Sequence, residues 1–125
     1  MEKTILDTSF ISAFFNENDS NHSMAVQAAA RISSCNIFIP SVVFAELMSF
    51  SKDKTRRDSD INLSLDMADE IPCLDSSNLK RYISFIKKLP NTFTAIDSII
   101  LFHAKENSAQ LITFDKKLST SSFYC

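Results

Sequence analysis

The chain contains no glycine among its 125 residues, and this absence limits the loops and folds that it can form. Loops that wrap a phosphate closely, as in P-loop NTPases and Rossmann dehydrogenases, need glycine because the backbone must approach the ligand. The absence of glycine therefore argues strongly against those two classes. A turn that requires a positive φ must use Asn, Asp or Ser instead, the residues that tolerate it next best. We expect such a turn at Asn107-Ser108, shortly before an apolar run.

The composition is that of one globular domain spanning residues 1–125. Apolar residues make up 45% of the chain and charged residues 22%, which is ordinary for a soluble domain with its own core. The net charge of -2 gives no overall attraction to nucleic acid. An enzyme that holds phosphates through a metal ion and a local basic patch remains compatible with that charge.

The cysteines and the chain start indicate the compartment. Cys35, Cys73 and Cys125 are widely spaced, which indicates neither a disulfide framework nor a zinc site. A reducing, cytoplasmic compartment is the simplest inference. The first residues lack the long apolar run of a signal peptide, and no stretch reaches the length that spans a membrane. We therefore expect a cytoplasmic protein without a membrane segment.

Short apolar runs alternate with amphipathic runs of helical length along the chain. This alternation predicts a parallel sheet with helices on both faces. We expect strands at 3–6, 36–39, 71–74 and 110–114, and a turn of helix with a residual edge strand in 116–125. We expect helices from a cap at Thr8 or Ser9 through residue 15, and at 23–34, 42–50, 61–69, 78–89 and 93–106.

Four carboxylates lie inside apolar runs, where a charge is costly to bury unless something pairs with it. No lysine or arginine recurs beside all four of them to do so. A shared divalent cation would serve all of them, and their hard oxygen atoms suit Mg²⁺ or Mn²⁺ better than Zn²⁺. The four residues are Asp7, Glu46, Asp97 and Asp115.

Two of these carboxylates directly follow predicted strands, Asp7 the first and Asp115 the last. In open α/β sheets the active site forms outside the carboxyl ends of the strands, so these two converge if their strands are neighbours. Three of the four carboxylates also have a structural alternative. Asp7 or Asp115 can cap a helix, and Glu46 can lie at the edge of its helix. Asp97 is the hardest to explain structurally, because apolar residues flank it.

Basic residues gather between residues 51 and 60 and again after Asp115. They form either a solvated surface or a basic rim for a polyanionic substrate. His103 lies on an apolar helix and is expected in the core or at its rim, and neither it nor His22 shows a catalytic pattern. The residues that could contact phosphates are Lys52, Lys54, Arg56, Arg57, Lys116 and Lys117.

In order and spacing, four stretches resemble the motifs of the PIN domain family. They are residues 5–9, 40–47, 94–100 and 111–118, and together they extend over nearly the whole chain. The resemblance implies a three-layer α/β/α domain with a parallel sheet of four to five strands in the order 3-2-1-4-5. The glycine usual before the fourth strand is replaced here by Asn107-Ser108, and only ten residues follow Asp115, so the fifth strand is short or absent.

The same resemblance implies an endoribonuclease that depends on Mg²⁺ or Mn²⁺. It implies that Ser9 and Thr113 are hydroxyls that hold a water or a carboxylate near the metal. Small chains made only of this domain are most similar to VapC-type toxins, which cut a structured RNA, often a tRNA. Such toxins are usually homodimers silenced by a small antitoxin protein. The catalytic and metal-binding carboxylates would be Asp7, Glu46, Asp97 and Asp115.

Three other functions stay open at this point. The chain could be a stand-alone PIN ribonuclease that processes RNA. It could be a phosphohydrolase in which Asp7 attacks phosphorus, although that class carries a second acid where this chain has Ser9. It could also be a binding module that has lost catalysis, although such a module would not require all four carboxylates.

Overall fold

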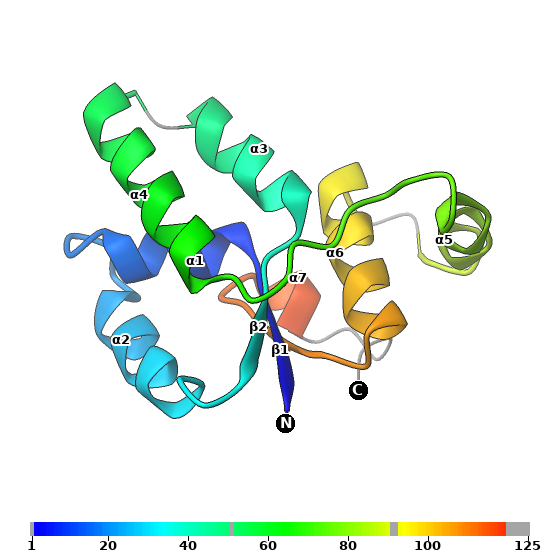
Figure 1. Ribbon diagram of the computed structural model, residues 1–125, viewed down its shortest axis with the longest axis horizontal. Helices are drawn as coiled ribbons and strands as arrows, with labels where there is room; N and C mark the ends of the chain where they lie inside the picture. The colour runs from blue at the N-terminus through cyan, green and yellow to red at the C-terminus, as the bar shows by residue number, and fades with distance from the viewer. Residues whose placement is uncertain (1, 51, 91–92, 120–125) are drawn as a thin grey trace.

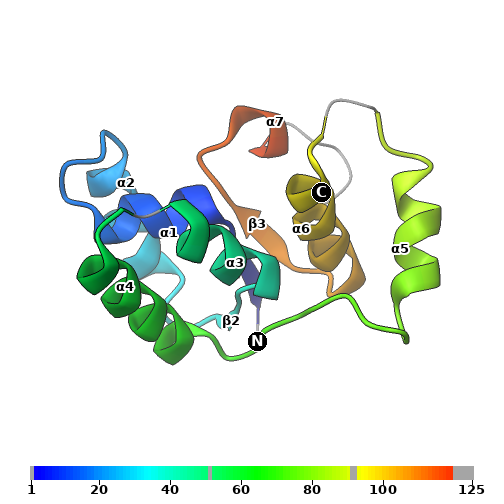
Figure 2. The same cartoon turned by 90° about the horizontal axis from the view of Figure 1, so that it is seen from above.

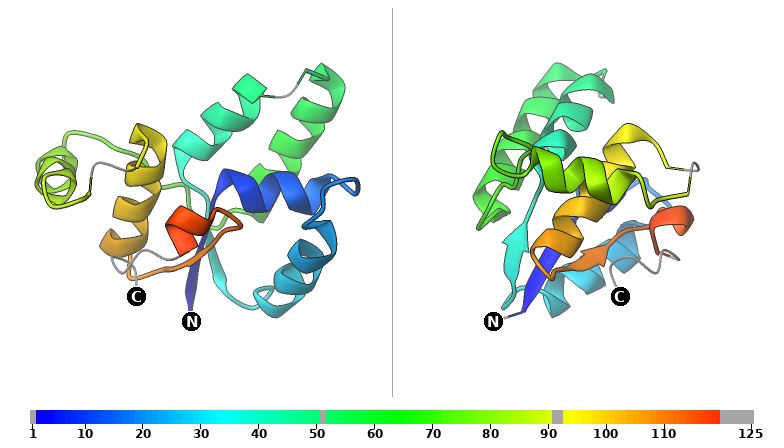
Figure 3. Two further views of the ribbon diagram at one scale, coloured as in Figure 1. Left: turned by 180° about the vertical axis from the view of Figure 1, so that it is seen from behind. Right: turned by 90° about the vertical axis from the view of Figure 1, so that its right-hand side faces the viewer.

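The computed structural model describes residues 2–50, 52–90 and 93–119, without the side chains of residues 50, 117 and 119. Within this part of the chain, a sheet of three parallel strands has the order β2-β1-β3. Figure 3 (right) shows the strands side by side, with β1 in the centre. The strands are β1 (Lys3–Leu6), β2 (Asn36–Phe38) and β3 (Gln110–Ile112).

Strand β1 is central because its side chains are buried on both faces. Thr4, Ile5 and Leu6 are at most 1% exposed, as expected for a strand covered on both sides by helices. The register pairs Leu6 with Ile112 of β3. The residues that follow these two, Asp7 and Thr113, therefore emerge together at the carboxyl ends of neighbouring strands.

The predicted strand at 71–74 is wrong, although the segment before it does lie beside β2. Phe38 forms an isolated parallel bridge with Glu70, and the Ile39 N–H donates to the Glu70 carbonyl at 3.0 Å. Pro72 has no N–H to donate, so the segment continues only as an acceptor, with the Pro72 carbonyl accepting from the Ser41 N–H at 2.9 Å. The predicted place of a strand on the far side of β2 is thus occupied by a single bridge. The predicted residual edge strand lies beyond residue 119, outside the described residues.

Helices cover both faces of the sheet, which gives the expected three-layer α/β/α architecture. Figure 1 shows the sheet nearly edge on, with α1, α2 and α4 to its left and α5 and α6 to its right, and Figure 2 shows α5 outermost, beyond α6. In the described part of the chain, every helix is too short or too polar to span a bilayer. The helices are α1 (Thr8–Phe15), α2 (His22–Arg31), α3 (Ser41–Phe50), α4 (Lys54–Met67), α5 (Leu79–Ile86), α6 (Ala95–Glu106) and α7 (Lys116–Ser119).

Helix α4 begins earlier than the predicted residue 61. Asp53 caps it, and its carboxylate accepts hydrogen bonds from the backbone N–H groups of Thr55 and Arg56. A cap at this position satisfies N–H groups that the first turn of a helix leaves without partners. The charged stretch after residue 53 is therefore the first part of a helix, and its arginines have a fixed direction.

The turn between α6 and β3 is the one expected from the absence of glycine. Ser108 has a φ of 51°, in the left-handed region. The next residue, Ala109, donates its N–H to the Ala104 carbonyl at 2.9 Å, which closes the end of the helix. A serine here accepts the strain that glycine would avoid.

Candidate active site

Asp7 directly follows β1 and caps the start of α1. Its backbone is extended, with φ -98° and ψ 178°, and its side chain accepts from the first turn of the helix. The acceptor atom is Oδ1, and the donor is the Phe10 N–H at 3.0 Å. The structural alternative drawn from the sequence, that Asp7 is a helix cap, is confirmed. A cap needs only one carboxylate oxygen, however, and the second is available for other contacts.

Both oxygens of Asp7 also accept hydroxyl hydrogen bonds. Ser9 Oγ donates to Oδ1 at 2.8 Å, and Thr113 Oγ1 donates to Oδ2. The backbone after β3 is held to the same two hydroxyls, because the Phe114 N–H donates to Ser9 Oγ at 3.0 Å and the Asp115 N–H donates to Thr113 Oγ1 at 2.9 Å. Ser9 and Thr113 thus hold the Asp7 carboxylate and fix the chain that carries Asp115.

Asp7 is only 2% exposed, and its surroundings change its titration. Burial raises the pKa of the Asp7 carboxyl, because the charged form loses its contact with water. Hydrogen bonds oppose the rise, the one from Thr113 most, while the negative charge of Asp115 adds to it. The charge of Asp115 therefore acts on Asp7, which agrees with their positions after neighbouring strands.

Glu46, on α3, reaches the same neighbourhood through Thr8. The Thr8 hydroxyl donates to Glu46 Oε1, and Thr8 is the residue directly after Asp7. Glu46 is half-buried, so it does not simply extend from the edge of its helix into water. Thr8 consequently holds the Glu46 carboxylate of α3 at the start of α1, where Asp7 is the N-cap.

Asp97 lies in the first turn of α6 and is half-buried. Its backbone N–H donates to Thr94 Oγ1 at 3.2 Å, and Thr94 is the N-cap of the helix. A carboxylate in this turn also interacts favourably with the positive end of the helix dipole. The Thr94-x-x-Asp97 spacing is a capping pattern that we overlooked in the sequence, but its hydrogen bond uses the backbone of Asp97 and does not account for the carboxylate.

The carboxylates of Asp7 and Asp115 are hard donors of the kind that a divalent cation such as Mg²⁺ prefers. Asp7 and Asp115 supply carboxylates that repel each other, and a cation would relieve that repulsion. In the described ranges, no group of three or more His, Cys, Asp or Glu is arranged to hold a metal ion. Mg²⁺ commonly takes one or two carboxylates and completes its shell with water and substrate phosphates. The pair fits that arrangement, and the assignment of all four carboxylates as ligands stays a prediction.

Two of the predicted basic residues lie beside this site. Arg56 and Arg57, in the first turns of α4, line a cavity of about 170 Å³ that also borders Thr8. Arg56 Nη2 donates to the Phe15 carbonyl at 3.1 Å, which holds the guanidinium against α1. The other side chains that line this cavity are Ser12, Asn16, Leu47 and Asp60.

The remaining basic residues have less defined positions. Lys52, Lys54 and Lys116 are exposed, and the Lys117 side chain lies outside the described ones. Sequence reasoning missed Ser12 and Asn16 as residues near the site. The sequence did contain a sign of them: Thr8, Ser12 and Asn16 follow one another at intervals of four residues, which places their side chains along one face of α1.

Comparisons with known proteins identify this architecture. The sequence model of the PIN domain family matches residues 4–123. No curated protein matches the sequence. The fold is similar to that of VapC20 from Mycobacterium tuberculosis, a sarcin-ricin loop cleaving toxin, with a TM-score of 0.78, 16% identity, and coverage of 96% of this chain and 95% of that one.

A second similar structure is VapBC2 from Rickettsia felis, bound to a DNA fragment from their promoter. It has a TM-score of 0.73 and 23% identity, with coverage of 97% of this chain and 94% of that one. At these identities the likeness concerns the fold. It confirms the three-layer arrangement around a parallel sheet, and the family model confirms the expected family resemblance.

Proposed function

Because the chain belongs to the PIN domain family, we propose that it is a metal-dependent endoribonuclease and the toxin of a type II toxin–antitoxin module. The observation that carries the proposal is the buried Asp7 carboxylate. It lies at the carboxyl end of the central strand, bonded to Ser9 and Thr113 and close to Asp115. A helix cap alone would need neither the second hydroxyl nor the second carboxylate.

The proposed roles follow from what each side chain contacts. Asp7 and Asp115 would hold Mg²⁺ or Mn²⁺, with Glu46 and Asp97 as the further metal-binding carboxylates. When bound, such an ion lowers the pKa of a water molecule and stabilises the charge that develops on a phosphoryl group. Ser9 and Thr113 keep the Asp7 oxygens in one orientation, which preserves the geometry that a metal ligand needs.

The substrate would be RNA, bound through its phosphates. Arg56 and Arg57 support this proposal because α4 directs them to a cavity beside Thr8. Guanidinium groups bind phosphate in a two-pronged geometry, which suits a backbone contact without base specificity. The net charge of -2 means that this attraction is local. Further contacts at the rim would come from Lys52, Lys54, Lys116 and Lys117.

The proposed partners come from the two similar structures. VapC20 is a toxin that cleaves the sarcin-ricin loop, which supports a structured RNA, such as a ribosomal loop or a tRNA, as the substrate class here. VapBC2 supports a small antitoxin as the protein partner. A homodimer is proposed on the family resemblance, and the cytoplasm is the proposed compartment.

Cleavage of RNA by the purified protein tests the function. We expect cleavage in Mn²⁺ or Mg²⁺ that stops with EDTA and leaves 5′-phosphate and 3′-hydroxyl ends. Asp97→Asn should abolish it, whereas Thr94→Ala, which removes only the helix cap, should retain it. Asp66→Asn, an exposed carboxylate on α4, is the matched control. Cleavage that persists in EDTA would refute the metal-dependent mechanism, and full activity of Asp97→Asn would remove that residue from the site.

Expression in a bacterial host tests the toxin role separately. We expect growth arrest that requires Asp7 and that is relieved by co-expressing the neighbouring small reading frame. An active ribonuclease that does not slow growth would instead favour a stand-alone enzyme of RNA processing.

A further inference from the structure

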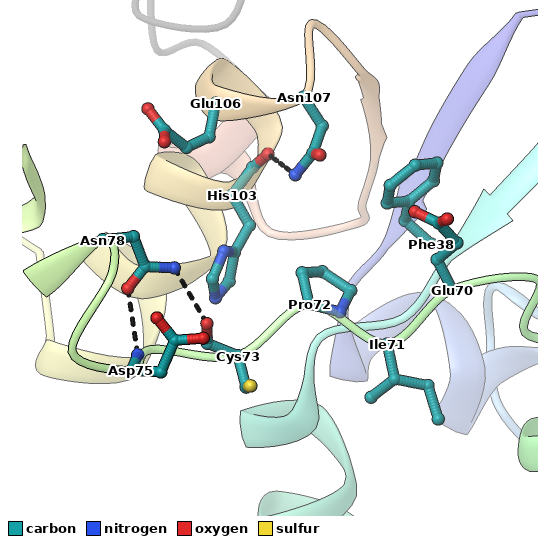
Figure 4. Close-up of a pocket in the computed structure, with 10 residues that line it drawn as sticks. All are labelled: Phe38, Glu70, Ile71, Pro72, Cys73, Asp75, Asn78, His103, Glu106 and Asn107. Carbon is teal, nitrogen blue, oxygen red and sulfur yellow. Dashed lines mark hydrogen bonds between the residues drawn. The ribbon is translucent and has the colours of Figure 1, made fainter.

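A second cavity lies away from the carboxylate site, at the end of α6. It has a volume of about 510 Å³ and lies between the extended segment 70–73, the residues before α5 and the last turn of α6. Figure 4 shows the side chains around it. None of the residues assigned to the nuclease site lines it. Any function of this cavity is therefore separate from the proposed cleavage of RNA.

The ring of His103 lines this cavity, and one of its nitrogens lacks a hydrogen-bond partner among the described residues. The residue is only 2% exposed, and its Nε2 has no hydrogen-bond partner among the described residues. Figure 4 shows the ring pointing from α6 toward Cys73 and Asp75. Burial lowers the pKa of the His103 imidazole, so the neutral form is favoured. A buried polar nitrogen without a partner is costly, and a ligand that bonds to it would recover that cost.

The cavity presents mainly hydrogen-bond acceptors and negative charge. Glu70, Asp75 and Glu106 line it, and no lysine or arginine is among its described lining residues. The amide of Asn78 donates to the Cys73 carbonyl at 2.9 Å, and that of Asn107 donates to the His103 carbonyl at 2.8 Å. These amide donors are thus directed to the backbone.

The end of α6 adds to this negative field. A helix carries partial negative charge at its C-terminus, where the last carbonyls lack partners within the helix. Glu106 is partly neutralised, because Arg81 Nε donates to it at 2.7 Å from outside the cavity. Glu70 and Asp75 are exposed carboxylates that face the cavity (Figure 4). The cavity consequently favours a positively charged group that donates several hydrogen bonds.

We propose that this cavity binds an organic cation, whose guanidinium or ammonium group donates to His103 Nε2 and to the carboxylates of Glu70 and Asp75. A metal ion fits less well, since no group of three or more His, Cys, Asp or Glu in the described ranges is arranged to hold one. An organic cation has N–H donors that point in several directions and reach acceptors that are further apart. The cation belongs either to a free small molecule or to an arginine of a partner protein.

Histidine NMR on the full chain gives a direct test, because the protein has only two histidines. Agmatine, which carries a guanidinium and an ammonium group, is the probe. We expect the His103 ring signals to shift saturably, while those of His22 stay unchanged. His22 is a suitable internal control because its Nδ1 already lies 2.8 Å from the Ala13 carbonyl. Equal shifts of both histidines, or no shift, would overturn the proposal.

Two further probes separate the sources of the cation. N-acetyl-arginine amide presents only an arginine side chain, and N-acetyl-citrulline amide is its uncharged counterpart. Binding of the arginine probe as tightly as agmatine would assign the site to a partner's arginine. Tighter binding of agmatine would assign it to a free dication. Binding of the citrulline probe as tightly as the arginine probe would refute the role of positive charge.

Single carboxylate changes provide the matched variants. Asp75→Asn keeps an oxygen that can accept from the Ser77 N–H, so the local turn should survive, and Glu70→Gln changes an exposed side chain. Each should weaken agmatine binding by about tenfold, the effect of one charge-assisted hydrogen bond. Asp66→Asn makes the same change in net charge away from the cavity and should leave binding unchanged. Equal weakening by all three would mean that net charge alone attracts the probe, which would contradict a built site.

Discussion

Asp7 and His103 are equally buried, since each is 2% exposed, but their surroundings differ. Both Asp7 oxygens accept hydrogen bonds from the protein, whereas His103 Nε2 has no partner among the described residues. Burial raises the pKa of Asp7 and lowers that of His103, because in each case the charged form loses water.

The difference separates two uses of a buried polar group. The bonds to Asp7 hold its carboxylate in one orientation, which is what its proposed role as a metal ligand requires. The Nε2 of His103 has a hydrogen-bonding capacity that the described residues leave unmet, and a donor from outside the chain would satisfy it. The exposed fraction alone does not distinguish the two groups, whereas their hydrogen-bond partners do.

The largest expected effect comes from Asp7→Asn. The amide oxygen can still accept from the Phe10 N–H, so the helix cap should survive and the free energy of unfolding should change by about 1 kcal/mol or less. RNA cleavage should fall by at least about a hundredfold, because the variant loses the charge that we propose binds the metal ion. Cleavage assays and urea unfolding of the same samples check both parts. Unfolding of the variant without added urea would show that Asp7 is mainly structural.

Thr113→Val should have a smaller effect on catalysis. The variant loses the hydroxyl that donates to Asp7 Oδ2 and that accepts from the Asp115 N–H. We expect cleavage to fall by about ten- to a hundredfold, as for other residues that orient a metal ligand. The Asp7 pKa should rise further, because the lost bond favours the charged form.

A shift of the pH–rate profile to higher pH distinguishes this positioning role from a merely structural one. Cleavage with an unchanged pH profile would contradict it. His103→Gln, in the other region, should leave the profile of cleavage unaltered and serves as the control.

The pH dependence of stability should have opposite signs for the two groups. The folded Asp7 binds its proton more tightly than the unfolded chain, whose carboxyl has the ordinary pKa of 3.8. Stability from this group is therefore lost as the pH rises from below 3.8 through the raised folded pKa. Relative to Asp7→Asn, the wild type should become less stable over that range.

For His103, the unfolded chain binds the proton more tightly, with an ordinary pKa of 6.5. Its contribution is present above 6.5 and is lost as the pH falls through the lowered folded pKa. Relative to His103→Gln, the wild type should lose stability as the solution becomes more acidic. Urea unfolding across the pH range measures both differences, and slopes of the same sign would contradict the comparison.

The smallest expected effect is that of Ser108→Gly. Ser108 has a φ of 51° and connects the helix of His103 to the strand that precedes Thr113. Glycine adopts this conformation without a steric cost, so the free energy of unfolding should rise by about 1 kcal/mol. Cleavage and agmatine binding should not change. A change in either would mean that the two regions respond to overall stability rather than to their own hydrogen bonds.

Several features of the site could be read from the chain. Asp7 and Asp115 follow apolar strands, and parallel strands direct such residues to one edge of a sheet. The turn at Asn107-Ser108 was expected because no glycine was present to take a positive φ. Ser9 and Thr113 were identified through the family resemblance, and their contact with Asp7 agrees with it.

Other features depended on contacts that local patterns do not contain. The run at 71–74 has the apolar character of a strand, but Pro72 interrupts its ladder and leaves one bridge to β2. The charged composition of residues 51–60 led us to begin the helix at residue 61. Helix α4 in fact begins at Lys54, because the Asp53 carboxylate caps it. The cap at Thr94, which accepts from the Asp97 backbone N–H, was also overlooked in the sequence.

Residue type and chain order were sufficient for the fold class and for placing Asp7 after the central strand, because strand periodicity and the direction of parallel strands act locally and repeat along the chain. The partners of each buried group required the folded chain. Thr113 meets Asp7 only through the β1–β3 register, and Thr8 meets Glu46 only through the approach of α1 to α3. Hydrogen bonds extend over about 3 Å, so whether a buried group is satisfied depends on tertiary placement that no single segment encodes.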